Sequence, residues 1–169
     1  GREVVVNLDL QNFFPTISYR RVKGVFRKMG YNEPVATVLG LLCCEPDTQQ
    51  VELDGERWFV QQGEARLPQG APTSPALSNI ICRSLDIRLQ GLAVRNGFNY
   101  TRYADDMTFS CGHAAQSAMR KLLWGVRAIV AEEGFVLHPD KTRMMHRGRQ
   151  QEVTGLVVND RLSVDRKTL

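Results

Sequence analysis

Asp105 and Asp106 form an adjacent pair of carboxylates in a predicted turn between two apolar segments. Two like charges side by side disfavour each other's ionised form, so an uncompensated pair near a protein core is costly. A divalent cation removes that cost, and carboxylate oxygens with room for water and phosphate ligands suit Mg²⁺. The pair is therefore a candidate metal site, although aspartate is also favoured in exposed turns for purely local reasons.

A third carboxylate, Asp9, lies on the less apolar face of a predicted strand over residues 4–10. If this strand lies beside the segment that carries Asp105 and Asp106, three carboxylates meet at one place. Such a set can hold two metal ions roughly 3.5 to 4 Å apart, the arrangement that clamps the attacking and leaving oxygens in phosphoryl transfer.

Hydrophobic periodicity and turn residues predict the elements that must position these carboxylates. A hairpin over residues 98–110 turns near residues 104–106, and a second hairpin turns at Asp54-Gly55. Helices are predicted between Ser18 and Gly30, after Asn32 with Pro34 in the first turn, from a Ser74 cap to residue 89, and over residues 114–133. Short strands follow, the clearest over residues 152–158, and Trp58 and Trp124 are expected to be packing residues.

Without residues 18–66, the predicted order of elements is strand, helix, hairpin, helix, strand. That order is the split βαβ (ferredoxin-like) plan of an α+β fold, an antiparallel sheet with two helices on one face. In this plan the first strand lies beside the hairpin, which brings Asp9 to Asp105 and Asp106. Residues 18–66 are expected to form a separate helical insertion with its own hairpin.

Five segments resemble the sequence motifs of reverse transcriptases, and they occur in that family's order over nearly the whole chain. They are NLDLQNFF at residues 7–14, LPQGAPTSP at 67–75, RYADD at 102–106, the stretch from GF to PDKT at 134–142, and VTGL at 153–156. The residues of the second and the last segment are most similar to those of bacterial retron reverse transcriptases. Group II intron-type enzymes are the nearest alternative within the family.

The resemblance implies an RNA-directed DNA polymerase that uses two Mg²⁺ ions, with Mn²⁺ as a possible substitute. Asp9 and Asp105 would bind both ions, and Asp106 would assist or hold the geometry. Lys141 would donate a proton to the pyrophosphate leaving group.

The resemblance also implies contacts to the incoming dNTP and to the primer. Backbone N–H groups would cradle the triphosphate, Phe14 would exclude a 2′-hydroxyl, and a rigid loop would reach the nucleotide; these residues are Leu10, Gln11, Asn12, Phe13, Phe14, Gln69 and Gly70. Primer and template contacts are expected from Arg143, Arg147, Arg149, Thr154 and Gly155, and Tyr103 either packs under the turn or touches the primer.

The implied architecture is a polymerase palm in residues 1–17 and 67–169, with part of the helical fingers in residues 18–66. The palm would end in a primer-grip-like strand. Finger strands that precede this chain and a thumb that follows it are expected to lie outside it, so this stretch alone should bind primer–template poorly and synthesise DNA weakly.

Composition and charge fit this interpretation. The 169 residues are 43% hydrophobic and 24% charged, which is typical of a globular protein and argues against disorder. The net charge of +4 arises entirely in residues 141–169, where a basic surface would suit a phosphate backbone. No apolar run approaches the roughly 20 residues of a membrane span, and the four cysteines lack CxxC spacing, so a cytoplasmic protein with reduced thiols is expected.

A retron enzyme implies an RNA template, a DNA or RNA primer, dNTPs and a cognate structured noncoding RNA. That RNA is partly copied into a branched RNA–DNA hybrid (msDNA) in antiviral defence, and an effector protein is a possible partner. Two hypotheses from other classes stay open at this point: a catalytically silent scaffold module, and a nucleotide cyclase, whose Gly-Gly-Asp/Glu hairpin tip this chain lacks.

Overall fold

The computed structural model describes residues 2–159 and 161–164. The chain forms two compact units, one made of Gly1–Gln11 with Arg83–Leu169 and the other of Asn12–Cys82. The second unit is an insertion that extends beyond residues 18–66 on both sides. The assignment of the two parts to palm and fingers stays a prediction.

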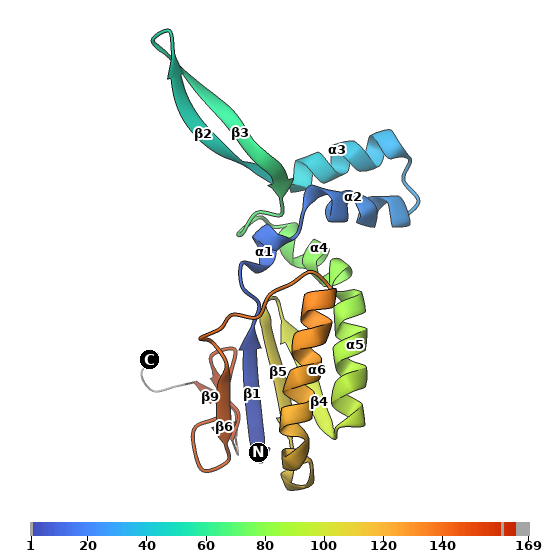
Figure 1. Cartoon of the computed structure of the whole chain (residues 1–169), viewed down its shortest axis with the longest axis vertical. Coiled ribbons are helices and arrows are strands. Elements are labelled where there is room, and N and C mark those ends of the chain that lie inside the picture. The colour runs from blue at the N-terminus through green and yellow to red at the C-terminus, as the bar shows by residue number, and fades with distance from the viewer. Residues whose placement is uncertain (1, 160, 165–169) are drawn as a thin grey trace. The chain divides into compact units, whose positions relative to one another are not determined.

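A four-stranded antiparallel sheet organises the first unit (Figure 1). Its strands are β1 (Val4–Asp9), β4 (Phe98–Tyr103), β5 (Asp106–Cys111) and β6 (Arg143–His146), in the order β4-β5-β1-β6. The register of β1 with β5 places Asp9 directly opposite Asp106. The predicted pairing of the first strand with the carboxylate hairpin is therefore confirmed.

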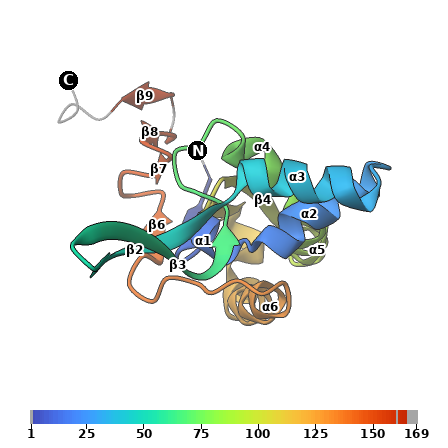
Figure 2. The same ribbon diagram turned by 90° about the horizontal axis from the view of Figure 1, so that it is seen from above.

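One face of this sheet is apolar and packed. Val4, Val6 and Leu8 are at most 3% exposed, and they lie beside Met107 and Phe109 of β5, which are fully buried. Helices α5 (Arg83–Arg95) and α6 (Met119–Glu132) lie side by side against the sheet (Figures 1 and 2). The side chains that these helices bury include Leu85, Leu89, Leu122, Val126 and Val130.

The opposite face of the sheet is polar. Because side chains alternate along a strand, Asn7 and Asp9 of β1 share this face with Asp106 and Thr108 of β5. The alternation thus separates a packed core from the surface that carries the candidate chemistry.

The helix predicted from Ser74 to residue 89 is wrong in its extent, because the structure interrupts it at Cys82. Helix α4 (Ser74–Ile81) belongs to the inserted unit, and α5 begins at Arg83 in the other. The N-cap position is Thr73, and the buried Ser74 hydroxyl instead donates to the carbonyl of Pro68 at 2.6 Å. Ser74 therefore fastens the preceding loop rather than capping the helix.

Two further predictions, the helix from residue 114 and the strand over residues 152–158, need correction. The helix expected from residue 114 begins as a 3₁₀ helix, η1 (His113–Ala118), which buries none of its side chains. The strand expected over 152–158 is a hairpin of β7 (Glu152–Val153) and β8 (Leu156–Val157), joined to β9 (Ser163–Val164). Thr154 and Gly155 have φ values of 48° and 81°, and two successive left-handed residues reverse the chain there.

The inserted unit contains the two predicted helices and the predicted Asp54-Gly55 hairpin. The two helices are α2 (Tyr19–Lys28) and α3 (Glu33–Cys43), and the hairpin strands are β2 (Glu45–Leu53) and β3 (Glu56–Arg66). The short helix α1 (Phe13–Thr16), which was not predicted, also belongs to this unit. Asp54 and Gly55 have φ values of 54° and 79°, as the tight turn requires.

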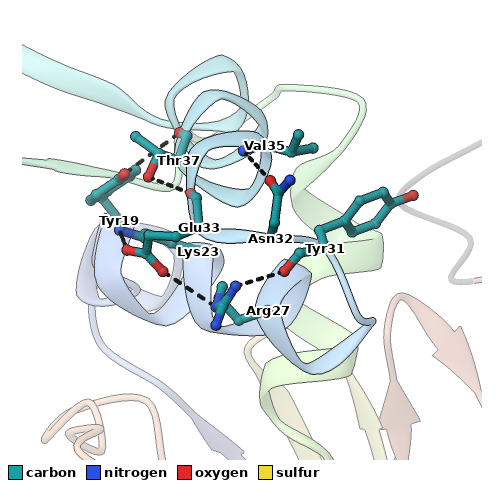
Figure 3. A network of polar contacts seen from close by, with 8 residues as sticks. All are labelled: Tyr19, Lys23, Arg27, Tyr31, Asn32, Glu33, Val35 and Thr37. Atoms are coloured by element: carbon teal, nitrogen blue, oxygen red, sulfur yellow. Dashed lines mark hydrogen bonds and ion pairs between the residues drawn. The ribbon is translucent and has the colours of Figure 1, made fainter.

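Polar contacts join α2 to α3 (Figure 3). Glu33 pairs with both Lys23 and Arg27 of α2, and Arg27 also donates to the carbonyl of Tyr31. The predicted cap is confirmed, since the Asn32 side chain accepts a hydrogen bond from the Val35 N–H at 3.0 Å. These contacts fix the short connection between the two helices.

Trp58 and Trp124 do not pack as expected. Trp58 is 53% exposed on the two-stranded ribbon of β2 and β3, and Trp124 is 74% exposed on the outer side of α6. A two-stranded ribbon has no second layer to cover its side chains. None of the helices in the described part of the chain is long and apolar enough to cross a membrane.

Candidate active site

The three predicted carboxylates lie at the same end of the sheet. Asp9 ends β1, Asp106 begins β5 opposite it, and Asp105 lies in the turn between β4 and β5. The Leu10 N–H donates to the carbonyl of Asp105 at 3.1 Å, which holds this turn against the end of β1. The position of the carboxylates thus follows from strand register.

The electrostatics of the cluster reflect crowding of negative charge. Burial, followed by the nearby Asp105 and Asp9 carboxylates, holds the pKa of Asp106 above its usual range, while Lys141 opposes this rise. The Lys141 ammonium lies 3.1 and 3.2 Å from the two carboxylate oxygens of Asp9. The positive charge of Lys141 therefore partly offsets the crowded negative charge.

The chemistry of these residues suits a divalent cation, because hard carboxylate oxygens whose charges repel one another gain most from one. A pocket of about 230 Å³ opens beside them and is lined by Asp9, Asp106 and Lys141, among others. In the residues that the structure describes, no three His, Cys, Asp or Glu side chains converge as a ligand set. The donor types fit a metal, and bringing them to ligand distance requires Lys141 and the carboxylates to adjust.

The hairpin of β7 and β8 forms one wall of the same pocket. Glu152, Thr154 and Gly155 line it, which brings the two predicted primer-placing residues next to the carboxylates. Asn7 ties this wall to the sheet, because its amide donates to the carbonyl of Glu152 at 2.8 Å and accepts from the Thr108 hydroxyl at 3.1 Å.

Asn7, Thr108 and Glu152 were missed by the sequence analysis. The signal available for Asn7 was its place two residues before Asp9 on the same face of a predicted strand. The signal available for Glu152 was its place directly before the VTGL segment, from which the resemblance implies primer contacts.

The predicted primer and template residues fall into two groups. Tyr103 is 73% exposed and lies opposite Asp106 in the β4–β5 register, so it faces the site rather than packing under it. Arg143 pairs with Asn7 and lines the pocket. Arg147 and Arg149 follow the other end of β6, where His146 pairs with Val4, and are therefore separated from the carboxylates along the strand.

Two of the backbone donors predicted for the triphosphate already have other partners. Besides the Leu10 bond to Asp105, the Gln11 N–H donates to the carbonyl of Val136 at 2.8 Å. These two N–H groups brace the site rather than point at a ligand, so the predicted cradle is wrong for them.

The other predicted nucleotide contacts belong to the inserted unit. Asn12 has a φ of 48°, Phe13 is 3% exposed and packs edge-to-face on Phe14, and Gln69 and Gly70 are exposed in the loop before α4. Their roles toward the carboxylates of the first unit stay predictions.

The paired strands thus bring Asp9 and Asp106 to one pocket, with Asp105 in the adjoining turn, in a chain that carries the five ordered segments. The chain belongs to the reverse transcriptase (RNA-dependent DNA polymerase) family, which it matches over residues 1–159.

Within that family its sequence is similar to retron enzymes. It is 49% identical to the retron Mx162 reverse transcriptase of Myxococcus xanthus over 167 residues, covering 94% of this chain and 34% of that protein. Identity to the retron Mx65 reverse transcriptase of the same organism is 46%, covering 99% and 39% of the two chains. Identity to the retron Ec86 reverse transcriptase of Escherichia coli is 39%, covering 94% and 43%. The chain thus spans roughly a third to under half of the length of these relatives.

Proposed function

We propose that the protein containing this chain is an RNA-directed DNA polymerase of the retron type. The observation that carries the proposal is the register that sets Asp9 opposite Asp106, with Asp105 in the adjoining turn, in a chain of the reverse transcriptase family. Identities of up to 49% to retron enzymes favour this branch over the group II intron type. The full set of acidic residues also argues against a silent scaffold.

In this proposal the first unit is the polymerase palm. Its strand order β4-β5-β1-β6, with α5 after the first strand and α6 after the hairpin, supports a split βαβ arrangement. The inserted unit is part of the fingers, from which Phe14 would exclude a 2′-hydroxyl and Gln69 would reach the nucleotide.

The reaction joins a primer 3′-hydroxyl to the α-phosphate of a dNTP and breaks the bond to pyrophosphate. Two Mg²⁺ or Mn²⁺ ions, held by Asp9 and Asp105, would supply charge stabilisation to the attacking and leaving oxygens. Asp106 would hold the geometry of this pair.

The chain's other residues at the pocket would position the substrates and move a proton. The Lys141 ammonium would leave Asp9 and donate a proton to the departing pyrophosphate. The exposed Tyr103 ring and the Thr154-Gly155 turn would contact the primer terminus, and Arg143 would contact the nucleic-acid backbone.

The proposed partners are an RNA template, a primer, dNTPs and a cognate structured noncoding RNA copied into a branched RNA–DNA hybrid. A role in antiviral defence and an effector protein belong to the same proposal. The thiols of Cys43, Cys44 and Cys111 are free, which is consistent with a cytoplasmic location.

Primer extension on an RNA template tests the proposal. The intact protein is given dNTPs, Mg²⁺ and a primed RNA, beside an Asp105→Asn variant and an Asp47→Asn control on the exposed β2 strand. We expect extension by the wild type and the control and none by Asp105→Asn. A folded wild-type protein that binds RNA but extends no primer would contradict the proposal and favour a catalytically silent scaffold.

A further inference from the structure

The turn that carries Asp105 is held from the core side by a buried arginine. The side chain of Arg102 is 4% exposed, and its Nη1 donates to the carbonyl of Ala104 at 2.9 Å. Ala104 has a φ of 50°, in the left-handed region that an alanine rarely adopts. The guanidinium thus holds the peptide group that directly precedes Asp105.

Arg102 is oriented in turn by a carboxylate of α5. Its Nε and Nη2 donate to Oδ1 and Oδ2 of Asp86 at 2.8 and 2.7 Å, a bidentate arrangement. The Tyr100 hydroxyl also donates to Oδ1 of Asp86, at 2.9 Å. Because a guanidinium is planar, two bonds on one side fix the direction in which Nη1 points.

This network lies on the opposite side of the sheet from the pocket. Arg102 pairs with Met107 and Tyr100 pairs with Phe109, both of which are fully buried. The alternate residues of β4, Thr101 and Tyr103, face the polar side. An ion pair next to an apolar layer carries a desolvation cost, so stability alone gives little reason for its presence there.

We propose that Arg102 and Asp86 are positioning residues that hold the Ala104–Asp105 turn in the conformation that presents Asp105 and Asp106 beside Asp9. Without the Nη1 bond the turn relaxes toward backbone angles more usual for alanine, and the carboxylates lose their alignment. The inference that these residues hold the turn depends only on the contacts described above. Its consequence for metal binding rests on the proposed function.

The test compares Arg102→Lys and Asp86→Asn with a matched control, Arg88→Lys, in the intact protein. Lysine keeps the charge of Arg102 but cannot reproduce the planar fork. Arg88 is also on α5, and its fork donates to Glu132 and Glu133, away from the turn. Asp86→Asn keeps the shape of the carboxylate and carries the test if Arg102→Lys fails to fold.

Two readouts are measured at a temperature at which all variants are folded. Hydrogen exchange of the peptide spanning residues 102–107 reports the turn, and Mn²⁺ binding, followed by electron paramagnetic resonance, reports the carboxylates. In Arg102→Lys and Asp86→Asn we expect faster exchange in this peptide and a Mn²⁺ Kd raised by about 10- to 100-fold. Arg88→Lys should leave both readouts at wild-type values.

Unchanged exchange of the turn in a folded variant would overturn the inference. So would faster exchange with an unchanged Mn²⁺ Kd, because the carboxylates would then be aligned by other contacts. If the wild type itself binds no Mn²⁺, the proposed function fails, while hydrogen exchange still decides whether Arg102 and Asp86 hold the turn.

Discussion

At the scale of single residues, the Lys141 ammonium opposes the crowded carboxylates of Asp9, Asp105 and Asp106. Asp9 is only 12% exposed at its side chain and pairs with Lys141, which is 55% exposed. Asp106 lies opposite Asp9. Removing one of these charges should therefore change the stability of the protein or its metal binding in a predictable direction.

Asp106→Asn is expected to raise the melting temperature of the metal-free protein at pH 7. Burial and the nearby Asp105 and Asp9 raise the pKa of Asp106 above the ordinary 3.8, so the folded state binds a proton more tightly than the unfolded state. Folding is therefore penalised as the pH rises from about 3.8 through the raised value, and the penalty is complete above it. Thermal unfolding with EDTA between pH 4 and 7.5 checks this.

The stabilisation by Asp106→Asn should shrink as the pH falls toward the ordinary pKa of aspartate. Asp140→Asn, at an exposed position near Lys141, serves as the control. A lower melting temperature of Asp106→Asn at pH 7 would contradict the assigned crowding of charge.

Lys141→Gln should change metal binding and catalysis in opposite directions. Mn²⁺ should bind more tightly, because the ammonium no longer competes for Asp9, which lies 3.1 Å away. Single-turnover extension should slow by about 100-fold or more, because a general acid is lost. A Lys141 that is merely solvated would give neither effect, and Lys121→Gln, at an exposed position of α6, is the control.

At the scale of elements, local signals were read correctly where one residue decides the structure. Asn32 with Pro34 predicted the start of α3, and the Asp54-Gly55 pair predicted the turn between β2 and β3. In each case the residues that form the cap or the turn are the same residues that predict it in the sequence.

The elements that were missed depend on distant contacts. The apolar spacing of Leu77, Leu85 and Leu89 continues through Cys82, so periodicity alone could not show that α4 and α5 are separate. Thr154 adopts a left-handed φ of 48°, which threonine does not signal in a sequence. Its hairpin is held by the bond from Asn7, a partner 145 residues from Glu152.

Asn32→Ala should lower the free energy of unfolding by about 1 kcal/mol, the usual cost of removing an N-cap. The physical reason is the loss of the bond that the Asn32 side chain accepts from the Val35 N–H at 3.0 Å. Urea unfolding measures the change, with Asn99→Ala at an exposed position of β4 as the control. An unchanged midpoint would show that the connection between α2 and α3 is held by the ion pairs of Glu33 instead.

Cys44, at the end of α3, should resist alkylation. Burial, with smaller contributions from Cys43 and Glu64, raises the pKa of its thiol to about 11 from the usual 9.0. The thiolate fraction at pH 8 is then about 100-fold lower, and the rate with iodoacetamide falls with it. Peptide mass spectrometry of native and urea-unfolded protein measures the rates, and equal rates in the two states would contradict the assignment.

At the scale of the whole molecule, the excess positive charge and the carboxylates belong to the same unit. The net charge of +4 arises in residues 141–169, and the first unit contains Gly1–Gln11 and Arg83–Leu169. Arg166 and Lys167, which contribute to the excess, lie outside the described residues.

The double variant Arg147→Gln, Arg149→Gln should weaken binding of primed RNA without slowing chemistry. Each lost phosphate contact reduces the slope of log K against log salt by about 1, so the slope should fall by about 2. Both side chains are exposed and are separated from the carboxylates along β6. Fluorescence anisotropy over a range of salt measures the slope, and an unchanged slope would remove these arginines from the nucleic-acid surface.

The sequence predicts those parts of the site that a motif or the order of elements specifies, and it misses those that depend on tertiary contacts. Motif order predicted Asp9, Asp105 and Asp106, and the split βαβ plan predicted that β1 would bring them together. The engaged N–H groups of Leu10 and Gln11 and the clamp formed by Asn7 arise from tertiary hydrogen bonds, which no motif describes.

A crystal structure of the intact protein with Mn²⁺ and a dNTP, examined by anomalous scattering, tests the central claim most directly. We predict two Mn²⁺ peaks roughly 3.5 to 4 Å apart between Asp9 and Asp105, with the Lys141 ammonium moved away from Asp9. Peaks at any other place, with Lys141 still paired to Asp9, would contradict the assignment of these carboxylates as the catalytic metal site.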